Sequence, residues 1–172
     1  ISDLPAIKNG ETYTDQSYTQ SPMSDYQDWL RHGSKLVLGH QTNKLAPINM
    51  ERVAALPDEG MNWTNLPTHL VPDNLRRMSE KYGGGVGAKT RFSRLQRDGL
   101  FSTIVTSPDP YWGAFIHPTQ NRVISVREAA RAQSFPDCIK FEGGLVSRYR
   151  QIGNAVPPLL AQVLGNKIIE VL

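Results

Sequence analysis

The densest run of apolar side chains lies at the C-terminal end of the chain, where it predicts a helix from about Pro157 to Leu172. The apolar members of this helix are Leu159, Leu160, Val163, Leu164, Ile168, Ile169, Val171 and Leu172. They cover a broad part of the helix surface, which a folded protein has to bury. Because this face is wide for a chain of 172 residues, we expect it to pack on a partner surface outside the chain.

Two polar patterns precede this helix. Ser125 and Glu128 have the spacing of a capping box, which predicts a helix over 126–134 that ends at Phe135 and Pro136. Gly153 and Asn154 are expected to form a tight turn, after which Pro157 and Pro158 suit the start of the last helix. This turn is either a plain helix entry with an asparagine cap or a polar clamp on a small ligand at the helix N-terminus.

Weaker patterns predict several short elements. The predicted helices run from a Ser21 cap through Arg31 to near Gly33, over 50–56 behind an Asn49 cap, and over 75–81 behind Asp73 or Asn74 with Gly83 at the end. The predicted strands are 35–38, 100–106 and 122–124, and residues 1–20 are expected to be mostly loop. This mixture predicts an α+β fold of short strands and helices.

Composition narrows the classes of function. The net charge of +3 permits a polyanionic partner but does not require one. Cys138 is the one cysteine, which excludes a disulfide framework and favours a reducing compartment. The four histidines, at positions 32, 40, 69 and 117, are too scattered for a zinc site, so no metal is expected. No apolar run reaches the ~18 residues of a membrane span, and the N-terminus has no signal-peptide pattern, so no membrane partner is expected.

A glycine cluster over 83–87 is followed by the cations Lys89, Arg91, Arg94 and Arg97. A dinucleotide fingerprint would need a strand before the cluster, whereas a helix is predicted there, and a P-loop would need a glycine directly before the lysine. Four cations interleaved with Phe92 and Leu95 suit a DNA backbone instead. The alternative is a solvated basic face.

These residues carry a family resemblance. Residues 121–137 together with 151–158 resemble motifs IX and X of the DNA cytosine C5-methyltransferases. The run from Arg94-Leu-x-x-Asp98 through Thr103-Ile-x-Thr106 to Arg122 resembles the approach to motif IX, and 60–67 resembles the middle of the target-recognition region. Residues 1–5 resemble the segment after motif VIII. The Phe-x-Gly-x-Gly, Pro-Cys-Gln and Glu-Asn-Val motifs of the family are absent from the sequence.

The resemblance therefore implies the C-terminal part of such an enzyme. Residues 1–20 would be the connector after motif VIII, 21–120 the target-recognition domain and 121–150 the motif IX region. Residues 151–172 would carry motif X and the closing helix of a Rossmann-like cofactor domain whose remainder lies outside this chain. The family flips the target cytosine from the duplex, activates it with a thiolate and a glutamate, and transfers a methyl group from S-adenosylmethionine.

The resemblance also implies roles for individual residues. No catalytic residue is assigned within this chain. Lys89, Arg91, Arg94 and Thr103 would bind DNA, with the 84–94 and 103–113 loops facing the major groove; Phe135, Asn154 and Ala155 would line the S-adenosylmethionine pocket; Arg127, Glu128, Arg131 and Gly153 would be structural.

The expected partners are double-stranded DNA and the N-terminal catalytic part, in a protein that is monomeric when complete. It would be cytoplasmic and nucleoid-associated in a bacterium, where it could serve a restriction-modification system, or nuclear in a eukaryote. Two alternatives remain: a non-catalytic DNA-binding subunit or regulatory remnant of the family, and an unrelated nucleotide-binding protein built on the glycine cluster.

Overall fold

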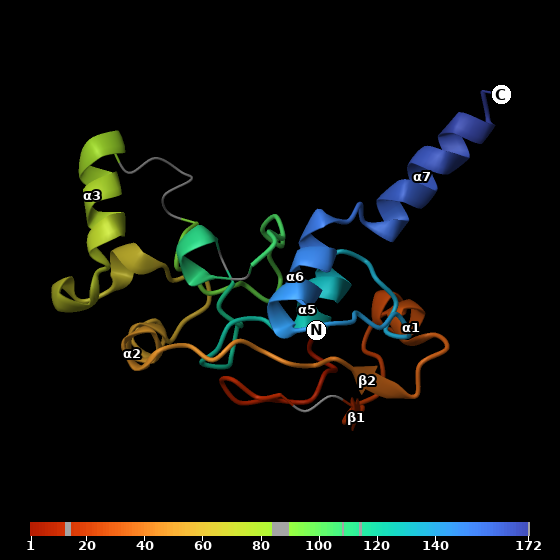
Figure 1. The fold of residues 1–172 in the computed structure, drawn as a ribbon, viewed down its shortest axis with the longest axis horizontal. Helices are drawn as coiled ribbons and strands as arrows, with labels where there is room; N and C mark the ends of the chain where they lie inside the picture. Colours follow the sequence, from red (N-terminus) through yellow and green to blue (C-terminus); the bar gives the residue numbers. More distant parts are fainter. Residues whose placement is uncertain (13–14, 84–89, 108, 114, 172) are drawn as a thin grey trace.

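The computed structural model describes residues 1–12, 15–83, 90–107, 109–113 and 115–171. In chain order its elements are β1 (Asp15–Ser17), α1 (Asp25–Arg31), β2 (Leu36–Leu38), α2 (Pro47–Ala54), η1 (Trp63–Asn65), η2 (Thr68–Leu70), α3 (Asp73–Tyr82), η3 (Pro110–Trp112), α5 (Val126–Ala132), α6 (Leu145–Asn154) and α7 (Pro158–Ile169). Helices α5 and α6 lie at the centre, α3 lies at one end of the molecule, and α7 projects from the other (Figure 1). The predicted mixture of short helices and strands is confirmed.

Three extended segments divide the interior into two apolar clusters. Arg94 bridges Ile116 in parallel, and Ile116 bridges Val123 in the antiparallel sense. Because successive side chains of an extended chain point to opposite sides, Phe115 and Ile124 enter one cluster while Ile116 and Val123 enter the other. We call the first the α6 core, since it contains Tyr149 and Ile152 of α6, and the second the α2 core, since it contains Val53 of α2. These segments therefore fix how the two halves meet.

Residues 61–93 form an excursion from the rest of the protein, and its two ends lie next to each other. The amide of Gly60 donates to the carbonyl of Arg94 over 3.1 Å, and the amide of Arg94 donates to the carbonyl of Met61 over 2.8 Å. Helix α3, whose Leu75 is buried in the α2 core, lies inside this excursion. Gly83 ends α3 with a φ of 70°, the left-handed conformation expected of a glycine at a helix C-terminus.

Helix α5 begins as its sequence predicts. The Ser125 hydroxyl accepts from the amide of Glu128 over 3.1 Å, and the Glu128 carboxylate accepts from the amide of Ser125 over 2.6 Å. The capping box is therefore confirmed, although the helix ends at Ala132 rather than at 134.

Helix α5 also carries two buried arginines that join distant segments. Arg131 donates to Asp3 over 2.6 Å and to Asp137 over 2.5 Å, and these carboxylates raise the pKa of its guanidinium against the opposing effect of burial. Arg127 donates to the carbonyls of Leu38 and Ile139 over 2.8 and 2.7 Å. Arg131 joins the N-terminal segment to the exit of α5, and Arg127 joins β2 to it.

Several local predictions are wrong. Helix α1 is capped by Ser24 rather than Ser21, and α2 begins at Pro47 without a side-chain cap, so Asn49 lies inside it. The segment 100–106 forms no strand, because no backbone hydrogen bond joins it to another described segment. Its Phe101, Ile104 and Val105 pack on the α6 core instead. The short pair of β1 and β2, in which Gln16 is opposite Val37, was predicted only in its second strand.

The predicted turn at Gly153 and Asn154 is also wrong. Both residues belong to the last turn of α6, a helix for which no prediction was made, and Ala155 is its C-cap. The missed signal is the spacing of Leu145, Tyr149 and Ile152, which places all three on one helix face. The chain turns only afterwards, at 155–157, before α7 begins at Pro158.

Helix α7 packs on very little of this chain. None of its residues is buried, and Val163, Leu164 and Ile168 are 59%, 53% and 58% exposed. The broad apolar face that the sequence predicted is therefore present and uncovered in this structure. Within the described ranges, no helix combines the length and the apolar character that membrane crossing takes.

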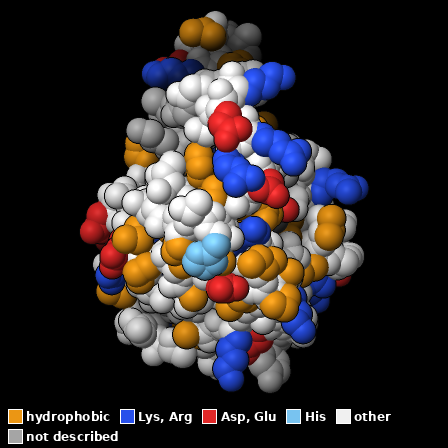
Figure 2. Space-filling model, turned by 90° about the vertical axis from the view of Figure 1, so that its left-hand side faces the viewer, with side chains coloured by type: hydrophobic (Ala, Val, Ile, Leu, Met, Phe, Trp, Pro, Cys, Tyr) orange, Lys and Arg blue, Asp and Glu red, His pale blue; other side chains and the backbone are white. Residues whose placement is uncertain are grey.

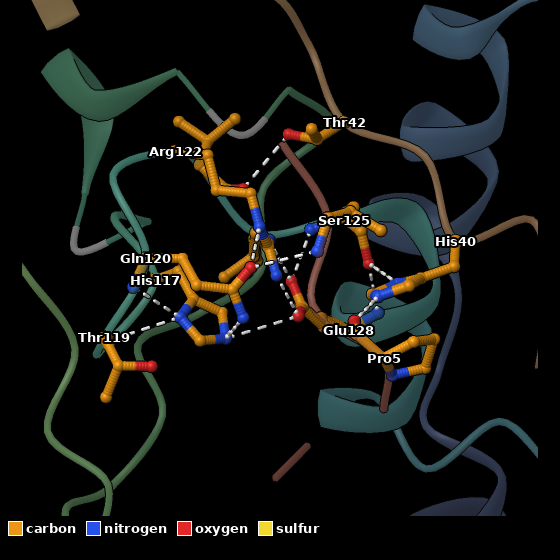
Figure 3. Close-up of polar contacts among 12 residues, drawn as sticks. Pro5, His40, Thr42, His117, Thr119, Gln120, Arg122, Ser125 and Glu128 are labelled. Atoms are coloured by element: carbon orange, nitrogen blue, oxygen red, sulfur yellow. Dashed lines mark hydrogen bonds and ion pairs between the residues drawn. The ribbon is translucent and has the colours of Figure 1, made fainter. Parts of the chain in front are cut away.

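Glu128 lies at the centre of a buried polar network (Figure 3). Arg122 reaches both carboxylate oxygens of Glu128 over 2.7 Å, and both side chains are 1% exposed. Burial alone would raise the pKa of Glu128, but the guanidinium of Arg122 outweighs it and holds that pKa well below its ordinary range. Nearby, the Ser125 hydroxyl is 2.8 Å from Nδ1 of His40, whose Nε2 is 2.8 Å from the carbonyl of Pro5.

The same network fixes the tautomer of His117. Its Nδ1 accepts from the amides of Thr119 and Gln120, each over 3.1 Å, and these bonds shape the turn at residues 117–120. The proton therefore lies on Nε2, which faces the Glu128 carboxylate at 3.4 Å. Burial lowers the pKa of His117 to about 4 despite this carboxylate, so the ring is neutral at pH 7.

Replacing Glu128 with Gln should destabilise the protein strongly, because the guanidinium of Arg122 would lose its counter-charge in the interior. Breaking a buried ion pair on one side costs about 3–5 kcal/mol. Chemical denaturation measures the loss. The matched control is Glu170→Gln, whose partner Lys167 is exposed and whose loss should cost less than about 1 kcal/mol. Equal free energies of unfolding for the two variants would contradict this account.

Acidification should destabilise the protein in part through His117. In the unfolded chain this ring takes up a proton near its ordinary pKa of 6.5, whereas the folded ring stays neutral down to about 4. Stability therefore falls as the pH drops through this window, by about 2 kcal/mol between pH 7 and pH 5. His117→Asn keeps an acceptor for the turn amides but does not titrate, so its free energy of unfolding should decline less over the same range. Parallel declines in both proteins would refute this role of His117.

Candidate functional site

Arg94 lies inside the protein and not on a DNA-facing surface. Its side chain is 2% exposed. It donates to the carbonyls of Leu56 and Val53 near α2, to those of His117 and Gln120, and to Oδ1 of Asn121, over 2.7 to 3.1 Å. All five acceptors are neutral, and burial lowers the pKa of this guanidinium below its ordinary value. The five N–H donors of a rigid guanidinium suit this set of acceptors better than a lysine ammonium would.

This position corrects the expectation that Arg94 faces the major groove. The side chain holds α2 against the 117–121 turn, so its role in the structure is to fix these two segments. The sequence placed it among surface cations because Lys89, Arg91 and Arg97 surround it. The hydrophobic neighbours Phe92 and Leu95, which are both buried, were the available signal that the chain turns inward here.

The other expected DNA contacts lie in different surroundings. Arg91 is half-buried and donates to the carbonyl of Tyr111 over 3.4 Å, beside the Phe92 ring that packs edge-on against Tyr111. Lys89 lies outside the described residues, as does the rest of the 84–89 run. Arg97 pairs with Glu59 over 2.5 Å on the surface.

Helix α3 adds three exposed cations to the same end of the molecule, namely Arg76, Arg77 and Lys81. Figure 2 views this end, and Lys and Arg side chains gather mainly along one margin of it, with acidic side chains between them. One of these acidic partners is Asp73, 2.7 Å from Arg76. The surface is therefore basic in places and suits contacts to individual phosphates rather than one continuous basic band.

Thr103 is presented outward by its neighbours. Its side chain is exposed, whereas Ile104 is only 9% exposed and Val105 is half-buried, both packed on the α6 core. The following loop is anchored by Asp109, whose carboxylate accepts from the amide of Tyr111 over 2.9 Å and begins η3. An exposed hydroxyl on a backbone fixed by the core is a suitable phosphate contact.

Phe135, Asn154 and Ala155 lie at one end of α6. Gln133 donates to the carbonyl of Ile152 over 3.3 Å, and the amide of Leu159 donates to the hydroxyl of Ser134 over 3.1 Å, so the exit of α5 adjoins the exit of α6. Phe135 is half-buried with its ring edge-on to Phe141 at 5.2 Å between centroids, and Asn154 is exposed.

The chemistry of these side chains fits S-adenosylmethionine. The cofactor presents an aromatic base and polar groups, and the end of α6 offers an aromatic ring, an exposed amide and a small half-buried residue. No described residue hydrogen-bonds the Asn154 side chain, so its amide remains available to a ligand. No group of metal-ligating side chains is found among the described residues.

A cleft of about 600 Å³ lies elsewhere, between the first residues, α1 and the 95–101 loop. Its apolar lining includes Met23, Tyr26, Leu30 and Phe101. Of the cations expected to suit a DNA backbone, Arg97 lines this cleft, whereas Arg91, Arg94, Thr103 and the three residues expected to bind the cofactor do not.

Comparison with known proteins supplies the family. The sequence model described as C-5 cytosine-specific DNA methylase matches residues 6–170. DNA (cytosine-5)-methyltransferase 1A of Oryza sativa is 35% identical over 182 residues, which cover 98% of this chain and 12% of the rice protein. DNA (cytosine-5)-methyltransferase 1 of Mus musculus is 30% identical over 224 residues, or 98% of this chain and 14% of the mouse protein. The chain thus spans about an eighth of the length of these relatives.

A solved structure supports the fold. It is a prophage protein from E. coli described as a DNA modification methyltransferase, and it superposes with a TM-score of 0.59 at 23% identity. The superposition covers 93% of this chain and 42% of that protein. Because the family model extends over nearly all of its residues, this chain belongs to the C-5 cytosine-specific DNA methylase family.

Proposed function

We propose that this chain is the C-terminal part of a DNA (cytosine-5)-methyltransferase, in which it contacts the target DNA and completes the S-adenosylmethionine pocket. The observation that carries the proposal is the meeting of two segments at the end of α6. The segment around Thr103 resembles the family's DNA contact, the segment at Asn154 and Ala155 resembles its cofactor contact, and the backbone of residues 105 and 106 lies against Gly153. In the proposed reaction the methyl donor and the flipped base must lie side by side, so their binding segments have to adjoin.

S-adenosylmethionine, when bound, supplies the methyl group. Phe135 would offer its ring to the adenine, and Asn154 and Ala155 would position the cofactor at the exit of α6. Thr103 would donate its hydroxyl to a phosphate near the target base. The thiolate and the carboxylate that activate the cytosine would come from the remainder of the protein, so this chain orients both reactants without attacking either.

The uncovered face of α7 supports the proposed placement within a larger protein. Val163, Leu164 and Ile168 project from a helix with no buried residue. Apolar surface removed from water is worth about 25 cal/mol per Å², so covering this face would stabilise the assembly. The proposed cover is the remainder of the Rossmann-like cofactor domain, which α7 would complete.

The direct test is a labelled-methyl assay on duplex DNA. A longer protein that contains this chain should transfer methyl groups from S-adenosylmethionine to cytosine C5, and the 172 residues alone should transfer none. Asn154→Ala in the longer protein should weaken S-adenosylmethionine binding by about three- to tenfold, the value of one hydrogen bond. Asn166→Ala, at an exposed position of α7, is the control. A longer protein that binds DNA and never transfers methyl groups would favour a non-catalytic DNA-binding subunit.

The salt dependence of DNA affinity tests the contact of Arg91. If its guanidinium meets a phosphate, Arg91→Gln should reduce the slope of log affinity against log salt by about one. Lys35→Gln removes the same charge from an exposed position beside β2, at the other end of the molecule, and should leave the slope unchanged. Identical slopes for both variants would remove Arg91 from the DNA interface.

A further inference from the structure

Gly153 makes a contact that no other residue type could make. It lies in the last turn of α6, where the exposed neighbour Asn154 ends the helix. A Cβ atom added to Gly153 would lie 2.6 Å from the carbonyl carbon and oxygen of Val105 and 2.7 Å from the amide nitrogen of Thr106. These are backbone atoms, so no side-chain rotation relieves the overlap. The absence of a side chain at 153 is therefore what lets the 105–106 backbone lie on the helix.

Glycine inside a helix reduces the stability of that helix, and the contact with residues 105 and 106 explains why position 153 is nevertheless a glycine. Glycine disfavours a helix relative to alanine because it loses more backbone freedom on folding. Gly165 in α7 is a contrasting case, since a Cβ there would meet nothing within 4 Å. The two glycines thus share a helical setting and differ in what surrounds them. Only at 153 does close packing require the missing side chain.

The surroundings leave the contact little room to shift. Ile152, directly before Gly153, is 0% exposed, and Ile104, directly before Val105, is 9% exposed; both belong to the α6 core. Each partner of the backbone contact is therefore attached to a side chain packed in the same core. Thr103 precedes this anchored stretch and Asn154 follows Gly153, so a displacement at the contact changes the distance between them.

We propose that Gly153 is a positioning residue that couples the DNA-facing segment to the cofactor-facing end of α6. The inference rests on the proposed function, since it assigns DNA to the Thr103 segment and S-adenosylmethionine to Asn154 and Ala155. Occupation of the cofactor site restrains the end of α6, and the backbone contact passes that restraint to residues 105 and 106. Cofactor and DNA then bind cooperatively, and the coupling is the same in both directions.

The test uses the longer protein that contains this chain, with Gly153→Ala and Gly165→Ala as a matched pair. DNA affinity is measured with and without saturating S-adenosylhomocysteine, and the ratio of the two gives the coupling factor. Wild type and Gly165→Ala should share a coupling factor clearly above one. In Gly153→Ala this factor should fall by about fivefold or more, while S-adenosylhomocysteine affinity without DNA stays within about twofold of wild type.

A third variant separates coupling from stability. Leu66→Ala truncates a buried side chain of the α2 core and lowers the melting temperature away from the contact. It should retain the wild-type coupling factor even where its melting temperature falls as far as that of Gly153→Ala. The inference is overturned if Gly153→Ala keeps the wild-type factor, or if Leu66→Ala loses it to the same degree. Wild-type protein that binds neither DNA nor S-adenosylhomocysteine would instead refute the proposed function itself.

Discussion

The ion pair of Arg122 and Glu128 is the constraint from which the arrangement of the molecule follows. One carboxylate closes the capping box that begins α5, neutralises a guanidinium in the interior and faces the neutral ring of His117. A buried pair of this kind is costly to desolvate, and it is kept only where its geometry and hydrogen bonds are good. Here it joins the start of α5 to the turn at 117–122. The extended segment that follows this turn then divides the α6 core from the α2 core.

This division separates two sets of exposed segments. The 101–105 segment and α6 each pack one side on the α6 core. Thr103 and Asn154 are therefore exposed on segments that the same core supports. The α2 core holds α3 and the loop around Arg91 on the other side. The part of the chain that resembles a cofactor contact and the part that resembles a sequence-reading surface are thus kept apart by backbone. Within the α6 core, the segment that carries Thr103 meets the end of α6 at the close approach of residues 105 and 106 to Gly153.

The sequence predicted best where local chemistry decides. The capping box at Ser125 and the glycine end of α3 need only neighbouring residues, and both were predicted. Helix α6 was missed because Gly153 and Asn154 suggest a turn, whereas the packing of Tyr149 and Ile152 overrides that preference. The segment 100–106 has the residue types of a strand, but strand formation needs a neighbour to pair with, and this requirement is not visible in the segment.

The candidate site residues also differ in how much of their surroundings the sequence could predict. Arg127, Glu128 and Arg131 were expected to be structural, and each is buried with several hydrogen-bond acceptors or donors. Arg94 was grouped with the surface cations by its position in the chain, while its actual surroundings are five oxygens from residues 53 to 121. Charge along a sequence predicts a basic surface only where the chain stays at the surface, and the buried neighbours Phe92 and Leu95 show that it does not.

The pairing of Gly60 and Met61 with Arg94 has a consequence for how such proteins diversify. Because the excursion over residues 61–93 begins and ends at hydrogen-bonded neighbours, its length adds little strain to the rest, and the entropic cost of a longer loop grows only slowly. The excursion nevertheless supplies Trp63, Leu66, Leu70, Leu75 and Phe92 to the α2 core, so a replacement segment has to bring apolar side chains that fill the same space. A chimera that exchanges it at these two points and preserves this packing keeps the hydrogen bonds of Arg94 and the whole of α5 and α6, while it acquires a new exposed surface.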